Sequence, residues 1–482
     1  MKIRIVFPFA AFFSFLFCSL LRAQDAASQS ADARLLSLEK AVRQLQQRNA
    51  ELESEVHQLK SKSGPTAPMS TSPDARFTTT TDSKAVSAPT PPPVDVHPGG
   101  SEFKLTLGGY IQVNFEGGDV SAFEGRFGST ALKDRFRLRR ARISLMGDFA
   151  EQFDFKIEGD FEQSDSAITA LKTVNVATGA TTTVNTANRT EFSGTDIFIN
   201  WHGIPEANFK VGQFKAPFGL ENLTPDTLIY TIERSLATGA LTPERQIGAM
   251  LWGKPLATAV PDEKDFVTYY AGIFNGNGRN FNNNDNNNFM GVGRLELLPF
   301  KGKIMGQDAS LKLGGDYLFS SDDAGTNISP TLNLKVNPDG SLTSYTLPGA
   351  DKRHAWSIDA WLNVGPFDLI GEYLDESVDG RTVNGVAPGF RDFEAHGWYV
   401  QGSYFIIPKK LQAVVKWEEL SPDQLPNDGI HSVTAGLNYY IHADNVKVMA
   451  DYVHTWSDFR EANPRFGDDQ FDEIVLRMQV IF

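Results

Sequence analysis

The sequence predicts an all-β fold, a transmembrane antiparallel β-barrel of about 16 strands, preceded by a short α-helical coiled coil. Three observations lead to this prediction. Apolar and polar residues alternate with period two from Phe103 to Phe482, the last residue. Short turns alternate with long polar connections over the same region. The chain has 35 Phe, 12 Tyr and 7 Trp, yet its mean hydropathy is only −0.27, as expected when apolar residues occupy every second position.

Residues 1–23 have the pattern of a secretory signal peptide. Lys2 and Arg4 precede the apolar run IVFPFAAFFSFLFCSLL, and we expect cleavage after Ala23. An uncleaved anchor is the alternative interpretation. Cleavage removes Cys18, the single cysteine of the chain, so the mature protein is expected to have no disulfide and no thiolate metal site.

Residues 32–62 are predicted to form a coiled coil, because apolar residues recur there at alternating spacings of three and four. A single amphipathic helix is the alternative. One polar residue occupies a core position. The expected core residues are Leu35, Leu38, Val42, Leu45, Asn49, Leu52, Val56 and Leu59.

Residues 63–100 are rich in Pro, Ser and Thr and lack the apolar residues needed to bury a core. We expect a disordered linker of about 100 Å when extended. It would separate the coiled coil from the barrel, to which we assign residues 101–482.

Within the barrel region, period-two alternation defines the strands. The expected spans are 103–115, 135–149, 153–163, 194–203, 208–214, 246–252, 265–274, 289–298, 309–320, 354–364, 367–375, 393–405, 410–419, 431–442, 445–457 and 470–482. An even count with short turns at one end and long loops at the other is typical of bacterial outer-membrane barrels. A barrel of this size encloses an aqueous channel. A soluble β-sandwich is the alternative, but it does not require alternation in nearly every strand.

The stretch RFRLRRARIS, residues 135–144, carries five arginines on one expected strand. With Ile143 and Leu145 facing lipid, Arg140 and Arg142 point into the lumen. Three further arginines have the opposite side-chain phase and are expected near the mouth of the barrel, namely Arg135, Arg137 and Arg139. A β-bulge or the end of the strand pairing there would keep them from facing lipid. An arginine at mid-bilayer costs about 2–4 kcal/mol, which favours the lumenal assignment. These arginines either attract anions or pair with carboxylates of the next strand, namely Asp154, Glu158 and Asp160.

The connection from Lys215 to Arg245 is too apolar for a free surface loop. We expect it to fold into the barrel and line a constriction, which would bury residues such as Leu228 and Ile232. Packing on a neighbouring subunit is the alternative. The charged residues that the constriction would present to the pore are Lys215, Glu221, Asp226, Glu233, Arg234 and Arg245. Arg294 is also expected in the lumen, with Glu296 able to neutralise it, and the Asn-rich residues 276–288 are expected to be a solvated loop.

Enzyme motifs are absent: the sequence has no GxSxG, HExxH, P-loop or CxxC pattern. We therefore predict no catalytic residues, no metal site and no cofactor. The net charge of −14 argues against nucleic-acid binding. A barrel enzyme that hydrolyses lipids would need a nucleophile paired with a base, and no such pattern is seen.

The segments RLRRARI, KVGQFKAPFGLE, GLNYYIHADNVKVMADY and the terminal RMQVIF together resemble the phosphate-selective porin family, also called porins O and P. The resemblance spans residues 103–482. It implies a trimer of 16-stranded barrels with an inward third loop and with cationic side chains that guide anions. The positions that match are Arg139, Arg140, Arg142 and Lys215. The third loop of this chain differs by carrying several carboxylates.

From these observations we predict a porin in the bacterial outer membrane. It would pass small solutes, with a preference for anions, by passive diffusion through a water-filled lumen. Its expected partners are outer-membrane lipids and two further copies of the chain. The coiled coil is expected in the periplasm, where it could contact peptidoglycan. The alternative is a structural tether that connects the outer membrane to the periplasm and conducts no ions.

Overall fold

The computed structural model describes residues 103–119, 134–161, 170–174, 181–185, 193–243, 245–284, 286–322, 334–336, 342–344, 350–380, 392–423, 425–464 and 468–482. The predicted signal peptide, coiled coil and linker lie outside these residues and stay predictions. Among the described residues, no helix is both long and apolar enough to cross a membrane.

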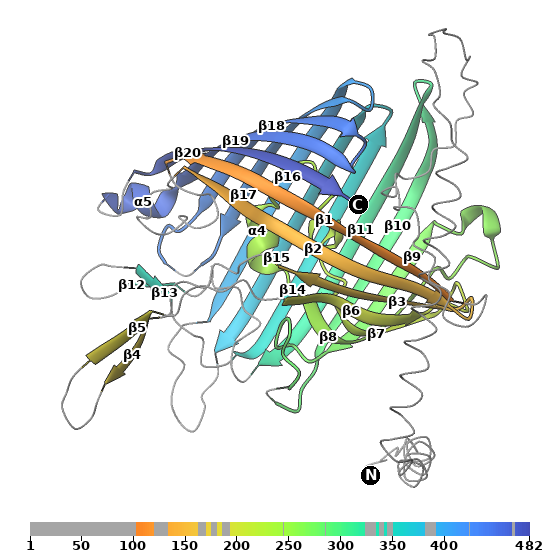
Figure 1. Cartoon of the computed structure of the whole chain (residues 1–482), viewed down its shortest axis with the longest axis horizontal. Helices are drawn as coiled ribbons and strands as arrows, with labels where there is room; N and C mark the ends of the chain where they lie inside the picture. The colour runs from red at the N-terminus through yellow and green to blue at the C-terminus, as the bar shows by residue number, and fades with distance from the viewer. Residues whose placement is uncertain are drawn as a thin grey trace, which may run out of the picture. The chain divides into compact units, whose positions relative to one another are not determined.

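Sixteen antiparallel strands form a closed barrel (Figure 1). In spatial order they are β1 (Phe103–Gly118), β2 (Arg135–Phe149), β3 (Phe153–Asp160), β6 (Ser193–Trp201), β7 (Asn208–Lys215), β8 (Arg245–Gly253), β9 (Val267–Phe274), β10 (Met290–Ile304), β11 (Gln307–Asp322), β14 (Ala350–Val364), β15 (Phe367–Gly380), β16 (Phe393–Ile407), β17 (Leu411–Ser421), β18 (Ile430–His442), β19 (Val446–Ser457) and β20 (Gln470–Ile481). Pairing of β1 with β20 closes the ring, so no strand edge is left open. The predicted barrel and its strand number are confirmed.

Four further strands lie in connections that the sequence analysis treated as long loops. β4 (Ala170–Val174) pairs with β5 (Thr181–Asn185), and β12 (Leu334–Val336) pairs with β13 (Leu342–Ser344). Each pair forms a two-stranded sheet apart from the barrel. They were missed because such short segments show too few alternations to separate a strand from a polar loop.

The outer face of the barrel is apolar and the inner face is polar. On β1, Leu107, Ile111 and Val113 point outwards and are exposed, whereas Gln112 and Asn114 point inwards and are buried. The same alternation continues to β20, where Ile474 and Leu476 are exposed outside. An apolar exterior with a polar interior suits a bilayer around an aqueous lumen.

A β-bulge in β2 changes which residues face the lumen. Arg140 pairs with Gln112 and Leu138 pairs with Val113, so Arg139 is the extra residue. Beyond the bulge, Phe136 is 82% exposed and Leu138 is 46% exposed on the outer face. Arg135 and Arg137 therefore take the inward phase, which keeps their charges away from lipid.

The hairpin between β10 and β11 is longer than the predicted spans 289–298 and 309–320. The two strands meet at Met305 and Gly306, both with positive φ, in a two-residue turn. A bulge between Leu297 and Phe300 shifts the side-chain phase in β10. The alternation in the sequence therefore breaks at that point, and the predicted strand ended too early.

Candidate functional site

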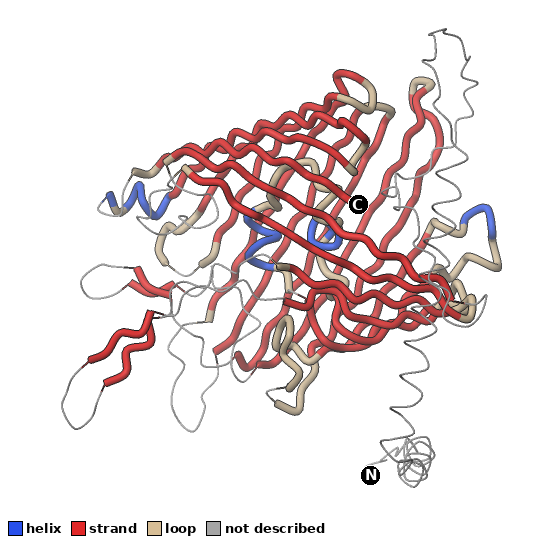
Figure 2. Tube along the Cα trace, in the orientation of Figure 1, coloured by secondary structure: helices blue, strands red, loops and turns tan. Residues whose placement is uncertain are grey.

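The connection between β7 and β8 folds into the barrel. It contains two short helices, α3 (Leu220–Leu223) and α4 (Leu236–Leu241), which lie inside the ring of strands (Figure 2). The Ser235 hydroxyl caps α4 by accepting a 3.1 Å hydrogen bond from the Thr238 N–H. We call residues 216–243 the inward loop. Its position inside the barrel agrees with the expected constriction rather than with packing on a neighbouring subunit.

Carboxylates of the barrel wall hold the inward loop by its backbone N–H groups. The bonds are Gly219 N to Asp316 Oδ2 (2.9 Å), Leu220 N to Glu372 Oε1 (2.7 Å), Glu221 N to Glu372 Oε2 (3.1 Å), Ile232 N to Asp451 Oδ2 (2.6 Å) and Leu236 N to Glu418 Oε2 (2.7 Å). These acceptors come from β11, β15, β19 and β17. Each bond satisfies a buried N–H group of the loop, so the wall restrains the loop along much of its length.

Cations and amides of the wall bind the carbonyl groups of the same loop. The Lys447 ammonium donates to the Thr227 carbonyl at 2.8 Å, the Asn438 amide to the Tyr230 carbonyl at 2.8 Å, and the Lys416 ammonium to the Glu233 carbonyl at 3.1 Å. Arg477 also donates to the Ile232 carbonyl. A buried loop needs partners for its backbone polar groups, and the lumenal wall supplies many of them.

Apolar contacts hold α4 against β15, β16 and β17. Leu236, Ala237 and Leu241 are buried in one cluster with wall residues such as Leu374 and Leu420. The close approach depends on Gly397 of β16, because a Cβ added there would lie 2.7 Å from the Ala237 Cβ. The inner wall is therefore apolar where the helix packs.

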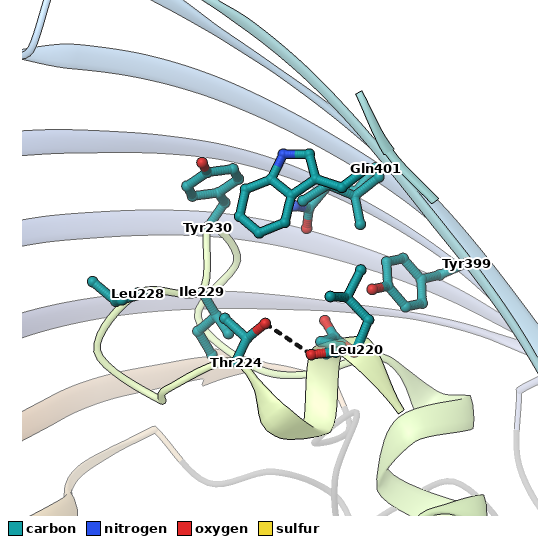
Figure 3. A pocket seen from close by; sticks show the side chains of 10 residues that line it. Leu220, Thr224, Leu228, Ile229, Tyr230, Tyr399 and Gln401 are labelled. Carbon is teal, nitrogen blue, oxygen red and sulfur yellow. Dashed lines mark hydrogen bonds between the residues drawn. The ribbon is translucent and has the colours of Figure 1, made fainter. Parts of the chain in front are cut away.

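A small pocket lies between α3 and the wall (Figure 3). Leu220, Tyr230 and Tyr399 contribute to its lining, and the Thr224 hydroxyl donates to the Leu220 carbonyl at 2.8 Å. The Tyr230 ring meets the Trp361 ring edge-on, with centroids 6.4 Å apart. These contacts bury apolar residues of the loop, as the apolar sequence of this connection predicts.

Two loop carboxylates, Asp226 and Glu233, are surrounded by arginines. Asp226 pairs with Arg142 at 2.8 Å, with Arg140 at 3.3 Å and with Arg234. Glu233 pairs with Arg139 at 2.7 Å, with Arg477 at 2.6 Å and with Arg140 at 3.8 Å. The arginines of β2 and the loop thus meet at one place in the lumen.

Burial by itself raises the pKa of both loop carboxyls. The guanidinium groups around them outweigh that effect, so the pKa of Asp226 and the pKa of Glu233 both lie well below their ordinary values. Both groups are therefore ionised at neutral pH, and each one offsets part of the arginine charge.

The ion pairs continue from this place along the wall. Arg142 also pairs with Asp160 at 2.7 Å and Glu158 at 3.8 Å, Lys156 pairs with Glu158 at 2.8 Å and Asp196 at 3.2 Å, and Arg245 pairs with Asp196 at 2.6 Å. We call the connected set the lumenal network. Among the described residues it contains seven cations (Arg139, Arg140, Arg142, Lys156, Arg234, Arg245 and Arg477) and five carboxylates (Glu158, Asp160, Asp196, Asp226 and Glu233). Among these described residues the cations outnumber the carboxylates by two.

Other candidate residues lie outside this network. Arg294 pairs with Asp316 at 2.8 Å, Asp359 at 2.7 Å and Glu296 at 2.9 Å, and its side chain has no exposed surface. The Lys215 ammonium donates to the Asn222 carbonyl at 2.5 Å. The Glu221 carboxylate is buried and accepts from the Ser235 N–H at 2.7 Å, rather than facing the pore. Glu221 therefore stabilises the loop from within, and Lys215 holds it from the end of β7.

The two halves of the lumen differ in exposure. Beneath the inward loop, wall residues such as Glu376, Gln412 and Arg477 are at most 1% exposed. On the other side, the Lys156 side chain of β3 is 24% exposed and the Lys312 side chain of β11 is 34% exposed. The loop thus covers the wall formed by β14–β20 and β1. It also covers part of the wall from β3 to β11, including Arg294 and Asp316, but leaves side chains there such as Lys156 and Lys312 partly exposed. We call this second wall, from β3 to β11, the accessible wall.

The wall residues that hold the loop were not identified in the sequence analysis. Glu372, Glu418 and Asp451 lie more than 150 residues after their partners in the chain. Their inward phase could be read from the alternation, but their partners could not. A run of inward carboxylates on strands that follow an apolar loop is the one signal that could have indicated them.

The comparison with protein families decides the identity. Residues 109–482 match the model of the family described as phosphate-selective porin O and P. The chain belongs to the phosphate-selective porin O and P family. Porin O of Pseudomonas aeruginosa is 23% identical over 461 residues, which cover 84% of this chain and 94% of that protein.

Solved structures agree with the barrel fold of this porin. A loop L8 deletion mutant of OmpT, an outer membrane protein of Vibrio cholerae, superposes with a TM-score of 0.50 at 10% identity, covering 79% of this chain and 100% of that one. At that identity the similarity shows the fold alone. Membership of the family, together with the barrel fold, identifies an outer-membrane porin. Such a protein is a water-filled channel for passive diffusion of small solutes rather than an enzyme.

Proposed function

We propose that this porin prefers small anions and that the lumenal network produces the preference. The observation that carries the proposal is the gathering of seven cations in that network, two more than the carboxylates among its described residues. A narrow lumen with low-dielectric walls focuses the field of such charges and raises the local concentration of anions. The name of the family and the relative Porin O support this direction, with phosphate as one candidate solute.

In this proposal the permeation path follows the accessible wall, from β3 to β11. The inward loop forms the other side of the path and narrows it. Arg139, Arg140, Arg142, Arg234 and Arg245 act through their field, because carboxylates already occupy their closest positions. Since that field is screened by salt, the anion preference falls as ionic strength rises.

We also propose a homotrimer with its N-terminal coiled coil in the periplasm, where peptidoglycan is a candidate partner. Phe103, the first described residue, pairs with Phe149 beside the tight β2–β3 turn. Short turns mark the periplasmic end in barrels of this class. In this proposal the coiled coil therefore joins the barrel at its periplasmic end.

Single-channel recording in a planar bilayer tests the proposal. In a KCl gradient, current steps with a reversal potential displaced towards that of chloride are the expected result, and the displacement should shrink in concentrated salt. A reversal potential displaced towards that of potassium would overturn the anion preference. Absence of current from heat-modifiable, folded protein would overturn the channel and favour a structural tether.

A further inference from the structure

Aromatic side chains gather on the lumenal face of four neighbouring strands, β6 to β9. On each strand the alternate residue points outwards: Ile197, Val211, Leu251 and Ile273 are all more than 40% exposed there. The inward residues between them form what we call the aromatic strip. It consists of Phe198, Lys210, Phe214, Trp252 and Tyr270.

Lys210 is the one cation of this strip, and it rests on aromatic rings. Its ammonium lies 4.3 Å from the centroid of the Phe198 ring and 5.5 Å from that of Phe214. No carboxylate of the described residues forms an ion pair with it. Lys156 and Lys312, which also face the accessible lumen, each pair with carboxylates. Asp154 and Asp196 act on this ammonium from a distance but form no ion pair with it. A ring face stabilises an ammonium without neutralising it, so Lys210 keeps capacity to bind an anion.

The second part of the strip is a flat aromatic pair. The Trp252 and Tyr270 rings are stacked, with centroids 6.2 Å apart and planes inclined by 11°. The Trp252 indole N–H donates to the Asn200 side-chain oxygen at 3.1 Å, which fixes the ring. Both rings are partly exposed, as are Phe198 and Lys210, whereas Phe214 is buried beneath them. The lumen therefore meets apolar ring surface next to a cation.

The strip lies beside the lumenal network. Lys156 of the network pairs across the ladder with Phe198, and Asn200 pairs with Lys210. An anion drawn along the accessible wall by the network thus reaches the rings and the ammonium of the strip directly.

We propose that the aromatic strip is a binding station for small organic monocarboxylates that carry an apolar ring. This inference rests on the proposed anion channel and names a substrate class for it. The carboxylate would pair with the Lys210 ammonium, and its ring would cover the faces of the aromatic side chains. Inorganic phosphate suits the strip less well, because it gains most from several converging N–H donors and here meets a single ammonium. Binding must be weak enough to allow release along the pore.

Chloride current through single channels, recorded with added benzoate, acetate or inorganic phosphate, tests this station. We expect benzoate to halve the current at a concentration about tenfold below that of acetate, the factor that one aromatic contact provides. Phosphate should resemble acetate. Lys210→Met should remove the block by benzoate, and Trp252→Leu should reduce the difference between benzoate and acetate.

Lys312→Met is the matched control, since it removes a lumenal lysine that is paired with Glu296 and lies outside the strip. It should leave the block by benzoate unchanged. Equal block by benzoate and acetate in the wild type would overturn the station, as would an undiminished benzoate block in folded Lys210→Met. In either case a reversal potential that still favours chloride would leave the anion channel standing, so the two proposals can fail separately.

Discussion

The Arg142 guanidinium donates to the Asp226 carboxylate across 2.8 Å, and this contact joins the β2 wall to a loop 84 residues further along the chain. The same guanidinium donates to Asp160 of β3 at 2.7 Å. An arginine of the strand thus holds the constriction in place while contributing to its charge. Substitutions at this place therefore change both the shape of the pore and its electrostatics, and tests of one must control for the other.

Replacing Asp226 by Asn should loosen the inward loop. The change removes the charge on which Arg140, Arg142 and Arg234 converge. Breaking a buried, paired charge of this kind costs about 3–5 kcal/mol. We expect noisier open-channel current and a lower temperature of heat modification on gels. Asp262→Asn, on the exposed connection between β8 and β9, should change neither quantity.

The wild-type channel should show a related dependence on pH. The pKa of Asp226 lies well below its ordinary value of 3.8 because nearby guanidinium groups outweigh the effect of burial. A carboxyl group whose pKa is lower in the folded protein than in the unfolded chain stabilises the fold at pH values above its unfolded-state pKa. That contribution is lost as the pH falls through the folded-state pKa. The difference in current noise between the wild type and Asp226→Asn should therefore stay constant from about pH 7 to about pH 4 and shrink only below that. A difference that already disappears near pH 6 would contradict this assignment.

Replacing Arg245 by Gln should weaken the anion preference without moving the loop. Arg245 pairs with Asp196, which Lys156 also binds, so the carboxylate keeps a partner. The substitution removes one positive charge, so the surplus of cations over carboxylates among the described residues of the network falls from two to one. In a KCl gradient we expect the reversal potential to move towards that of potassium. Lys303→Gln, at an exposed turn, is the control that removes the same charge far from the network; an equal shift in both variants would contradict the role of the network.

Replacing Gly397 by Val should displace α4 from the wall. The new Cβ would lie 2.7 Å from the Ala237 Cβ and 2.8 Å from the Glu419 carbonyl oxygen. Overpacking of this kind costs about 1–3 kcal/mol. We expect an altered single-channel conductance and a lower temperature of heat modification. Gly402→Val on the same strand has open space around its Cβ and should behave like the wild type.

Much of the barrel could be predicted because each strand carries its own evidence of orientation. Ile143 and Leu145 set the phase of β2, and the phase then placed Arg140 and Arg142 in the lumen, where the structure finds them. The excess of arginines in the opposite phase indicated a bulge or a frayed end, and the bulge lies at Arg139. A charge that cannot face lipid thus reveals a change in backbone geometry.

The wall contacts that hold the inward loop could not be predicted in the same way. Glu372 receives two N–H groups of the loop, yet the sequence around it reads as an ordinary alternating strand. Alternation shows whether a residue faces the lumen or the lipid. It does not show the level of that residue along the barrel axis or the residue that it contacts across the lumen. For the same reason the carboxylates of the loop were expected in the pore, whereas Glu221 is buried within the loop itself.

The positions in the chain of the wall residues that hold the inward loop have a consequence for assembly. Most of its anchors follow the loop in the chain. The last of them, Gln479, donates to the Thr227 carbonyl and lies only a few residues before Phe482. While strands are being added in order, the loop exists long before the surface that holds it. The constriction can reach its final form only when the last strand is in place, so ring closure and pore maturation are a single event.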